Sequence, residues 1–311
     1  MRRDHPRVGI ALAFVCLAIL GVMPIISNSR PAGFDALSFA FFLSVWQLLC
    51  SLPLVFREAG SADRGIFAAE LAPDLKRRTI AIILLTGAIF GLSTYVYVLA
   101  VEKAGAVSAA IAIQAYPLFA ILWETLFLKR GKTATELLFL LLLLVALYFL
   151  ATRGTWRVEG FSPWSVFALG VPFLWSVAHV VIKEVLDRTP ITPAQVTFFR
   201  VLVSALFLGI VLLAVAGPDA FAAGLGNLHF QTFALIMGLV YYLELIFWFY
   251  AVRYIDVSTA SSITVPWPAL TMLLAVVFLS EAVEGYQVIA LVVVAASVYG
   301  LLHAATRKRR A

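Results

Sequence analysis

Four ionisable side chains lie inside long apolar stretches of the sequence: Glu124, His179, Arg200 and Glu244. If these stretches cross a bilayer, a charge near its centre costs at least roughly 2.5 kcal/mol, so pairing is expected. We expect Arg200 to pair with Glu244 or Glu124, as an inner gate or as a clamp between helices. Snorkelling to the membrane interface is the alternative for Arg200 and Glu124. A lone histidine such as His179 is more often a hydrogen-bonded core residue than a proton carrier.

Aromatic and polar side chains near the middle of the apolar stretches form a second set of candidates. Most tryptophan and tyrosine residues of membrane proteins lie in the interfacial belts, so mid-depth aromatics are the exception. They predict the walls of a cavity for a small molecule, and aromatic packing between helices is the alternative. The candidate substrate-binding residues are Trp46, Tyr95, Gln114, Tyr116, Trp175, Tyr241, Tyr242 and Trp267.

Three prolines inside apolar stretches are candidate hinges: Pro117, Pro266 and Pro268. A proline in a helix removes one backbone donor and opposes the carbonyl four residues earlier. Pro266 and Pro268 would thereby free the carbonyls of Ser262 and Thr264, which in a bilayer need other partners. Such kinks suit a carrier that rocks between two states. A static kink held by neighbouring helices is the alternative.

Motifs of soluble catalysis and of metal binding are absent from the sequence. It contains no GxxxxGK[ST] loop, no HExxH, no CxxC pair and no GxSxG elbow. Cys16 and Cys50 lie inside apolar stretches without metal-ligand spacing, and we interpret them as small buried hydrophobic residues. We therefore expect no enzyme, no cofactor and no metal.

The stretches that position these residues are those of an all-α integral membrane protein. Of the 311 residues, 63% are hydrophobic and 13% are charged, about half of the roughly 25% typical of soluble domains. Because a helix of about twenty apolar residues crosses a bilayer, the sequence predicts ten transmembrane helices. Their predicted ranges are 8–26, 36–56, 79–100, 105–128, 136–152, 163–183, 195–216, 231–250, 257–279 and 286–304. The intervening segments, among them the one beginning at Gly217-Pro218-Asp219, are interpreted as connectors.

The basic residues give the expected orientation. Eighteen of the 23 lysines and arginines fall on the side of the N-terminus, four on the other side, and Arg200 inside a helix. The four are Arg30, Lys103, Arg153 and Arg157. The positive-inside rule then places both termini in the cytoplasm. The net charge of +6 is thus an orientation signal, and nucleic acid is not an expected partner.

The two halves of the sequence resemble each other at a constant offset. Residues 100–132 and 251–283 share seven identities when placed 151 positions apart, including the pair Pro117 and Pro268, and Gly87 and Gly238 obey the same offset. We interpret residues 1–152 and 153–311 as two five-helix repeats. An odd number of helices inverts the second copy, which is the inverted repeat of many secondary transporters around a central cavity. The GxxxG sequence of Gly87 to Gly91 predicts close helix packing rather than dimerisation.

These motifs resemble those of the ten-helix, EamA-type transporters of the drug/metabolite transporter superfamily, over essentially the whole chain. The resemblance rests on Pro117-Leu118-Phe119 with Phe127-Leu128, on Pro268 with Phe278-Leu279 and Glu281, and on Leu174-Trp175-Ser176. Two features depart from the family pattern: Lys129-Arg130 replaces a common acid, and Leu20-Gly21 lacks a tryptophan. The aromatic content is most similar to the bacterial aromatic amino acid exporter branch (YddG type). The resemblance implies a multi-pass carrier of the bacterial inner membrane, with the fifth and tenth helices at the periphery.

Three functions follow as hypotheses. The first is a secondary transporter that exports aromatic and other neutral amino acids by alternating access, with the lipid bilayer and a small-molecule substrate as its only expected partners. The sequence has no pair of intramembrane acids and thus no sign of obligatory sodium or proton coupling, which is consistent with facilitated diffusion or exchange. The second is a multidrug exporter of lipophilic cations, held by cation–π contacts. The third, a membrane enzyme or structural subunit, lacks a visible polar active site.

Overall fold

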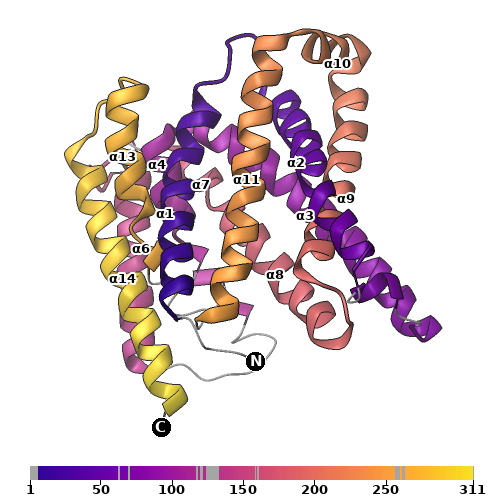
Figure 1. The fold of residues 1–311 in the computed structure, drawn as a ribbon. Helices are drawn as coiled ribbons and strands as arrows, with labels where there is room; N and C mark the ends of the chain where they lie inside the picture. The colour runs from indigo at the N-terminus through magenta and orange to yellow at the C-terminus, as the bar shows by residue number, and fades with distance from the viewer. Residues whose placement is uncertain are drawn as a thin grey trace. The chain divides into compact units, whose positions relative to one another are not determined.

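The computed structural model describes residues 6–61, 64–68, 71–116, 118–119, 122–123, 133–157, 159, 161–255, 260 and 263–310. Every regular element in these ranges is helical (Figure 1). The helices are α1 (Pro6–Asn28), α2 (Ala36–Ala59), η1 (Gly65–Ala68), α3 (Pro73–Ala104), α4 (Ala106–Ile113), α6 (Ala134–Ala151), α7 (Pro163–Phe167), α8 (Gly170–Arg188), α9 (Pro193–Val215), α10 (Gly217–Gly226), α11 (Leu228–Tyr254), α13 (Trp267–Phe278) and α14 (Gly285–Arg310). The all-helical class predicted from the sequence is confirmed for this part of the chain.

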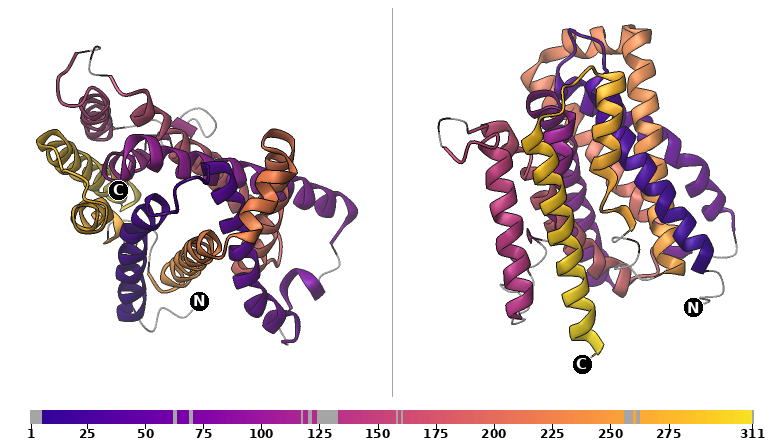
Figure 2. Two further views of the ribbon diagram at one scale, coloured as in Figure 1. Left: turned by 90° about the horizontal axis from the view of Figure 1, so that it is seen from above. Right: turned by 90° about the vertical axis from the view of Figure 1, so that its left-hand side faces the viewer.

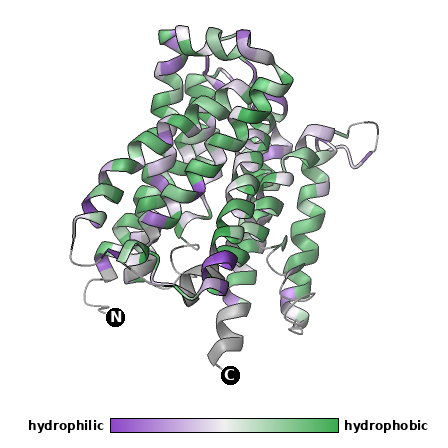
Figure 3. Cartoon of the chain, turned by 90° about the vertical axis from the view of Figure 1, so that its right-hand side faces the viewer, coloured by the Kyte–Doolittle hydropathy of each residue, from purple (hydrophilic) through white to green (hydrophobic). Residues whose placement is uncertain are grey.

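Seven helices within the described ranges are long and apolar enough to cross a membrane: α1, α2, α3, α6, α9, α11 and α14. Two shorter apolar helical segments cover Pro163–Ala178 and Trp267–Phe278. Apolar residues run along the helices, and hydrophilic residues gather near their ends (Figure 3). The chain is therefore a multi-pass membrane protein, while the count of ten spans remains a prediction.

Polar residues just before the helices fix several of the starting points. Asp35 accepts the backbone N–H of Ser38 at the start of α2. Thr133 and Glu136 form a reciprocal capping box at the start of α6. Thr192 and Gln195 form another at the start of α9. These caps satisfy donors that have no partner inside the helix, and such a donor would be costly near a membrane.

The chain folds as two compact units. Unit 1 comprises residues 1–28, 100–176 and 247–311, and unit 2 comprises residues 29–99 and 177–246. In unit 1, α6 packs along α14, and α13 packs against both α1 and α4 (Figure 2). In unit 2, α2 packs along α9, and α10 contacts both. Each unit therefore contains helices from both halves of the sequence.

Close helix packing depends on glycine at several of these contacts. A Cβ on Gly87 would lie 2.5 Å from Cβ of Val203. One on Gly238 would lie 2.6 Å from the carbonyl oxygen of Leu43. The Ser204 hydroxyl donates to the carbonyl of Gly87 over 2.7 Å. The interpretation of the GxxxG sequence as a packing motif is confirmed, because Gly87 faces α9 inside unit 2.

Two stretches differ from their predicted form. The segment after Gly217, expected to be a connector, contains the helix α10, which begins with Pro218 in its first turn; proline is well tolerated there because that N–H has no helical partner. The predicted span 163–183 is interrupted at Ala168-Leu169, between α7 and α8. Pro172 cannot donate to the carbonyl of Ala168, which instead accepts the N–H of Val171 at 3.2 Å.

Candidate functional site

Two helix interruptions in unit 1 form the first candidate site. The helix α4 ends at Ile113, and a turn at Gln114-Ala115 precedes Tyr116. A second turn lies at Val265-Pro266, directly before α13. These positions correspond under the offset of 151. A break in a membrane helix exposes backbone groups, and transporters use such breaks near substrate and ion sites.

A side-chain hydrogen bond joins the two breaks. Nε2 of Gln114 donates to the carbonyl oxygen of Val265 over 2.9 Å. Gln114, expected to face a substrate, thus has a structural partner at one of its polar atoms. On the other side of α13, the Thr271 hydroxyl donates to the carbonyl of Gly21 on α1 over 2.8 Å. The helix α13 is thereby held at its break and one turn further along.

Two of the proposed hinge prolines lie at the second break rather than inside a continuous helix. Pro266 is the cap residue that precedes α13, and Pro268 lies in the first turn of that helix. Since a first-turn proline costs no helical hydrogen bond, the chain ends one helix and begins another instead of kinking a single one. Pro117 and Glu124 lie outside the described residues.

Two of the three aromatic candidates of unit 1, Tyr116 and Trp267, directly follow these breaks in the sequence. Trp267 is buried, with 7% of its surface exposed. Tyr116, the residue at the equivalent position after the first break, is half-buried, as is Trp175 on α8. Beside Trp175, the hydroxyl of Ser176 accepts the indole N–H of Trp123 at 2.7 Å. The sequence prediction that Tyr116 and Trp267 occupy equivalent places agrees with their positions directly after the two turns.

A buried cation in unit 2 forms the second candidate site. Arg200 on α9 is 7% exposed, and its guanidinium carbon lies 4.0 Å from the ring centre of Phe90 on α3. Tyr241 and Glu244 on α11 lie near enough for electrostatic interaction with Arg200. Nε of Arg200 has no hydrogen-bond partner among the described residues. A buried guanidinium with an unused donor, stacked on a ring, is suited to binding a carboxylate.

Further polar and aromatic groups surround these helices in unit 2. Tyr241 shares a side-chain hydrogen bond with Thr94 and is buried, as is Tyr242. Tyr95 is half-buried on α3. The indole N–H of Trp46 donates to Oε1 of Gln231 over 2.7 Å. Trp46, predicted as a cavity wall, therefore has a fixed orientation between α2 and α11.

Two residues outside the predicted substrate-binding set carry unused polar groups. The hydroxyl of Tyr97 and Nε2 of Gln47 are buried and lack a hydrogen-bond partner within the described part of the chain. Such groups are rare in folded proteins and call for an explanation. Gln47 directly follows Trp46, so a search for amides at mid-helix depth would have found it. From the sequence Tyr97 is a tyrosine near the end of a predicted helix. Only its burial in the structure distinguishes it from an ordinary interfacial tyrosine.

The comparisons with known proteins agree with this architecture. A model of the EamA-like transporter family matches residues 7–152 and 162–303. A solved structure described as "Crystal structure of protein" is similar with a TM-score of 0.57 and 14% sequence identity, over 94% of this chain and 96% of that chain. At that identity the likeness concerns the fold alone. No curated protein matches the sequence.

The helical membrane architecture and the family match together define a membrane transporter of the drug/metabolite transporter type. The chain belongs to the EamA-like transporter family, which consists of transporters and not of enzymes. A small-molecule substrate and a lipid bilayer follow as partners. The exporter branch of aromatic amino acids, named from resemblance, is a finer assignment and is part of the proposal below.

Proposed function

We propose that this protein exports neutral amino acids, including aromatic ones, across the bacterial inner membrane by alternating access. The observation that carries the proposal is the environment of Arg200. An amino acid presents a carboxylate, an ammonium group and a side chain. Unit 2 offers a buried guanidinium with an unused donor, the carboxylate of Glu244 in its electrostatic range, and the buried ring of Tyr241. These groups match the three parts of the substrate.

In this proposal Arg200 and Glu244 interact with each other when no substrate is bound and exchange partners when it arrives. The substrate carboxylate pairs with Arg200, and its ammonium group pairs with Glu244. Because a charge that lost its partner inside the membrane would be expensive, only a ligand with both charges satisfies both residues. The pair thereby acts as the gate expected from the sequence and also selects zwitterions.

The repeated breaks of unit 1 supply the moving element of the proposal. Carriers built from inverted repeats place discontinuous helices at equivalent places in both copies, around the site about which the repeats rock. The turns at Gln114-Ala115 and Val265-Pro266 are such places. We include in the proposal the ten spans, the repeats 1–152 and 153–311, cytoplasmic termini and transport without obligatory ion coupling.

The alternative is export of lipophilic cations, with Glu244 or Glu124 as the counter-charge. The nearness of Arg200 argues against Glu244 in that role, since the arginine already offsets the negative charge that a permanent cation would need; Glu124 lies outside the described residues. Competition distinguishes the two. Quaternary ammonium compounds should block transport if cations are the substrate, and should leave amino acid transport unchanged if the present proposal holds.

Counterflow into liposomes that contain the purified protein tests the proposal, using a panel of amino acids, quaternary cations and sugars with and without a pH gradient. Neutral amino acids should exchange without the gradient. Arg200→Gln should lower the initial rate at least about tenfold, because hydrogen bonds to charged groups are strong. Arg57→Gln, on an exposed arginine of α2, is the control. Absence of counterflow for every amino acid would contradict the proposal.

A further inference from the structure

A polar cavity in unit 1 belongs to neither of the sites described above. It has a volume of about 440 Å³ and lies where the beginning of α4, the segment between α6 and α7, and the beginning of α14 meet. That volume is in the range of small-ligand sites. Its main polar lining residues are Lys103, Ser108, Arg153, Ser162, Glu284 and Gln287.

Buried, hydrogen-bonded groups build the wall of this cavity. Gln287 is 4% exposed, and its Nε2 donates to the Ser108 hydroxyl over 2.9 Å. Its Oε1 accepts the backbone N–H of Glu284 at 2.8 Å. Ser162 is 6% exposed, and its backbone N–H donates to the carbonyl of Ala151. One side chain thus ties the beginning of α14 to α4, so the wall is preformed.

The backbone at the end of α6 is held in an uncommon conformation beside the cavity. Arg153 has a φ of 51°, in the left-handed region, and Gly154 follows with a φ of 77°. A Cβ on Gly154 would lie 2.6 Å from Cβ of Tyr286, another lining residue. An arginine costs more than a glycine in the left-handed region. A binding role of the guanidinium in the cavity would explain why position 153 is arginine rather than glycine.

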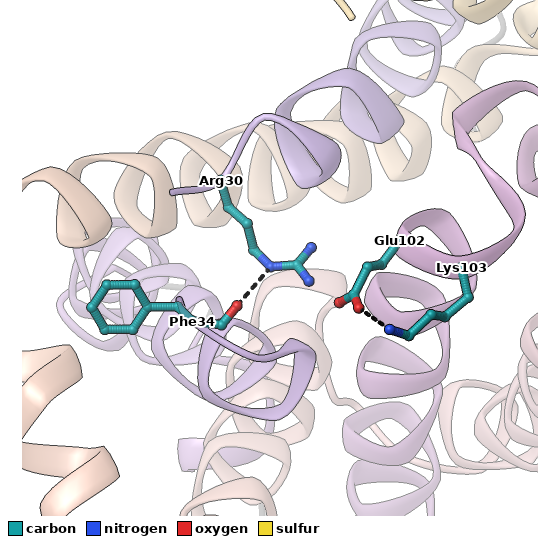
Figure 4. A network of polar contacts seen from close by, with 4 residues as sticks. All are labelled: Arg30, Phe34, Glu102 and Lys103. Atoms are coloured by element: carbon teal, nitrogen blue, oxygen red, sulfur yellow. Dashed lines mark hydrogen bonds and ion pairs between the residues drawn. The ribbon is translucent and has the colours of Figure 1, made fainter. Parts of the chain in front are cut away.

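The charges of the lining define the ligand. Lys103 forms an ion pair with Glu102, 2.6 Å from Nζ to Oε1 (Figure 4). The side chains of Arg153 and Glu284 have no ion pair or hydrogen bond within the described part of the chain. One unpaired cation and one unpaired anion face the same cavity. A purely anionic ligand would satisfy Arg153 and be repelled by Glu284, whereas a zwitterion satisfies both.

The place of the cavity along the membrane favours a lipid as the source of that zwitterion. The exposed ring of Trp156 lies on the segment between α6 and α7 that also carries Arg153, and the exposed ring of Trp164 lies in α7. Tryptophan is typical of the interface between membrane and water. From the cavity, α14 continues with the exposed residues Val288 and Val292. Acyl chains can pack along this apolar face while a headgroup occupies the cavity.

The basic residues of the outer side support the same conclusion. The sequence places only four there, and two of them, Lys103 and Arg153, line this one cavity. Arg30, a third, is engaged within unit 2, where its Nε donates to the carbonyl of Phe34 over 3.3 Å (Figure 4). Cationic side chains that meet at one cavity can hold a lipid phosphate through charge-assisted hydrogen bonds.

We propose that this cavity binds a zwitterionic group in which a phosphate or carboxylate lies next to an ammonium, and that the headgroup of an aminophospholipid is its source. Arg153 binds the anionic group, and Glu284 binds the ammonium. The site is separate from the substrate groups proposed in unit 2. If the cavity binds no such group, the transport proposal is unaffected.

Native mass spectrometry of the delipidated, full-length protein tests this site with phosphatidylethanolamine, phosphatidylglycerol and free phosphoethanolamine as probes. Phosphatidylethanolamine should bind more tightly than phosphatidylglycerol. Arg153→Gln should raise its Kd about tenfold, as expected for the loss of a charge-assisted bond. The exposed residues Arg157 and Glu159 lie nearby and outside the lining, so Arg157→Gln and Glu159→Gln are matched controls with unchanged Kd.

Glu284→Gln gives the discriminating result, because it leaves an arginine without the opposing carboxylate. This variant should bind phosphatidylglycerol more tightly than the parent does and phosphatidylethanolamine less tightly, a reversal that general unfolding does not produce. If free phosphoethanolamine displaces bound phosphatidylethanolamine, the site is assigned to soluble zwitterions. If it does not, the site is assigned to the lipid. Equal binding of both lipids by the parent and by both variants would overturn the proposal.

Discussion

Gln114 donates its side-chain hydrogen bond to the carbonyl of Val265, the residue 151 positions later in the sequence. This separation equals the offset between the two proposed repeats, so the proposed repeat makes the two partners equivalent residues. When equivalent residues of two copies contact each other, a twofold axis that relates the copies must pass close to the contact. The bond therefore supports an inverted repeat with its pseudo-twofold axis beside the two helix breaks.

The bond between the breaks is the first target for mutation. Gln114→Met keeps most of the side-chain volume and removes the donor. It should lower the free energy of unfolding by about 1 kcal/mol, the usual contribution of one hydrogen bond, and should slow counterflow. Thr232→Val, which removes an exposed hydroxyl bonded within its own helix, is the control. Unchanged thermal unfolding of Gln114→Met would show that the bond contributes nothing.

The interaction of Arg200 with Glu244 predicts strong coupling between their substitutions. Glu244→Gln removes the nearby carboxylate that offsets the positive charge of the buried arginine, so it should lower the free energy of unfolding. Arg200→Gln has the converse effect. The double variant should therefore be more stable in thermal unfolding than the sum of the single losses indicates, by about 1 kcal/mol or more. Strictly additive losses would mean that the two residues act independently.

A carboxylate from the other half of the chain caps α4. Glu281 accepts the backbone N–H groups of Ala106 and Val107 at 3.1 and 3.4 Å, while Gly105 in the cap position has no side chain to do so. Glu281→Ala should lower stability by roughly 1 kcal/mol, as other lost caps do. Hydrogen exchange should show faster exchange of these two amides. Glu159→Ala serves as the comparison, and equal protection in both variants would refute the capping role.

Helix packing in unit 2 predicts which glycines can be replaced. Gly238→Ala would place a methyl group 2.6 Å from the carbonyl oxygen of Leu43. Gly87→Ala meets Val203 in the same way. Each should cost about 1–3 kcal/mol, as overpacked cores do. Gly226 has open space around it, so Gly226→Ala should leave the melting temperature unchanged. Similar melting temperatures for all three variants would contradict the close packing.

Much of the architecture was predictable because the membrane imposes simple rules on a sequence. Apolar runs of helix length indicate spans, and the observed helices α1, α2, α6, α9 and α14 each overlap one predicted run closely. The motifs around Pro117 and Pro268 indicated the family, which the match over residues 7–152 and 162–303 confirms. The helix α10 was missed because turn-forming residues such as Gly217-Pro218 can also begin a helix.

The candidate site was predictable only as residue types. Trp46 and Gln114 were recognised as polar groups at mid-helix depth, yet each has an internal partner, Gln231 and Val265 respectively. Distance between helices decides such pairs, and hydropathy carries no information about it. Glu124 and Pro117 themselves lie outside the described residues, so their roles remain predictions.

The sequence and the tertiary structure determined different properties of this protein. The sequence determined the membrane class, the orientation signal and the offset of 151, because these depend on composition and order along the chain. Only the tertiary structure showed that α6 packs on α14 and α2 on α9, so that each unit combines both halves. It also placed Phe90, Tyr241 and Glu244 around Arg200. A buried charge depends on neighbours distant in sequence, and folding alone brings those neighbours together.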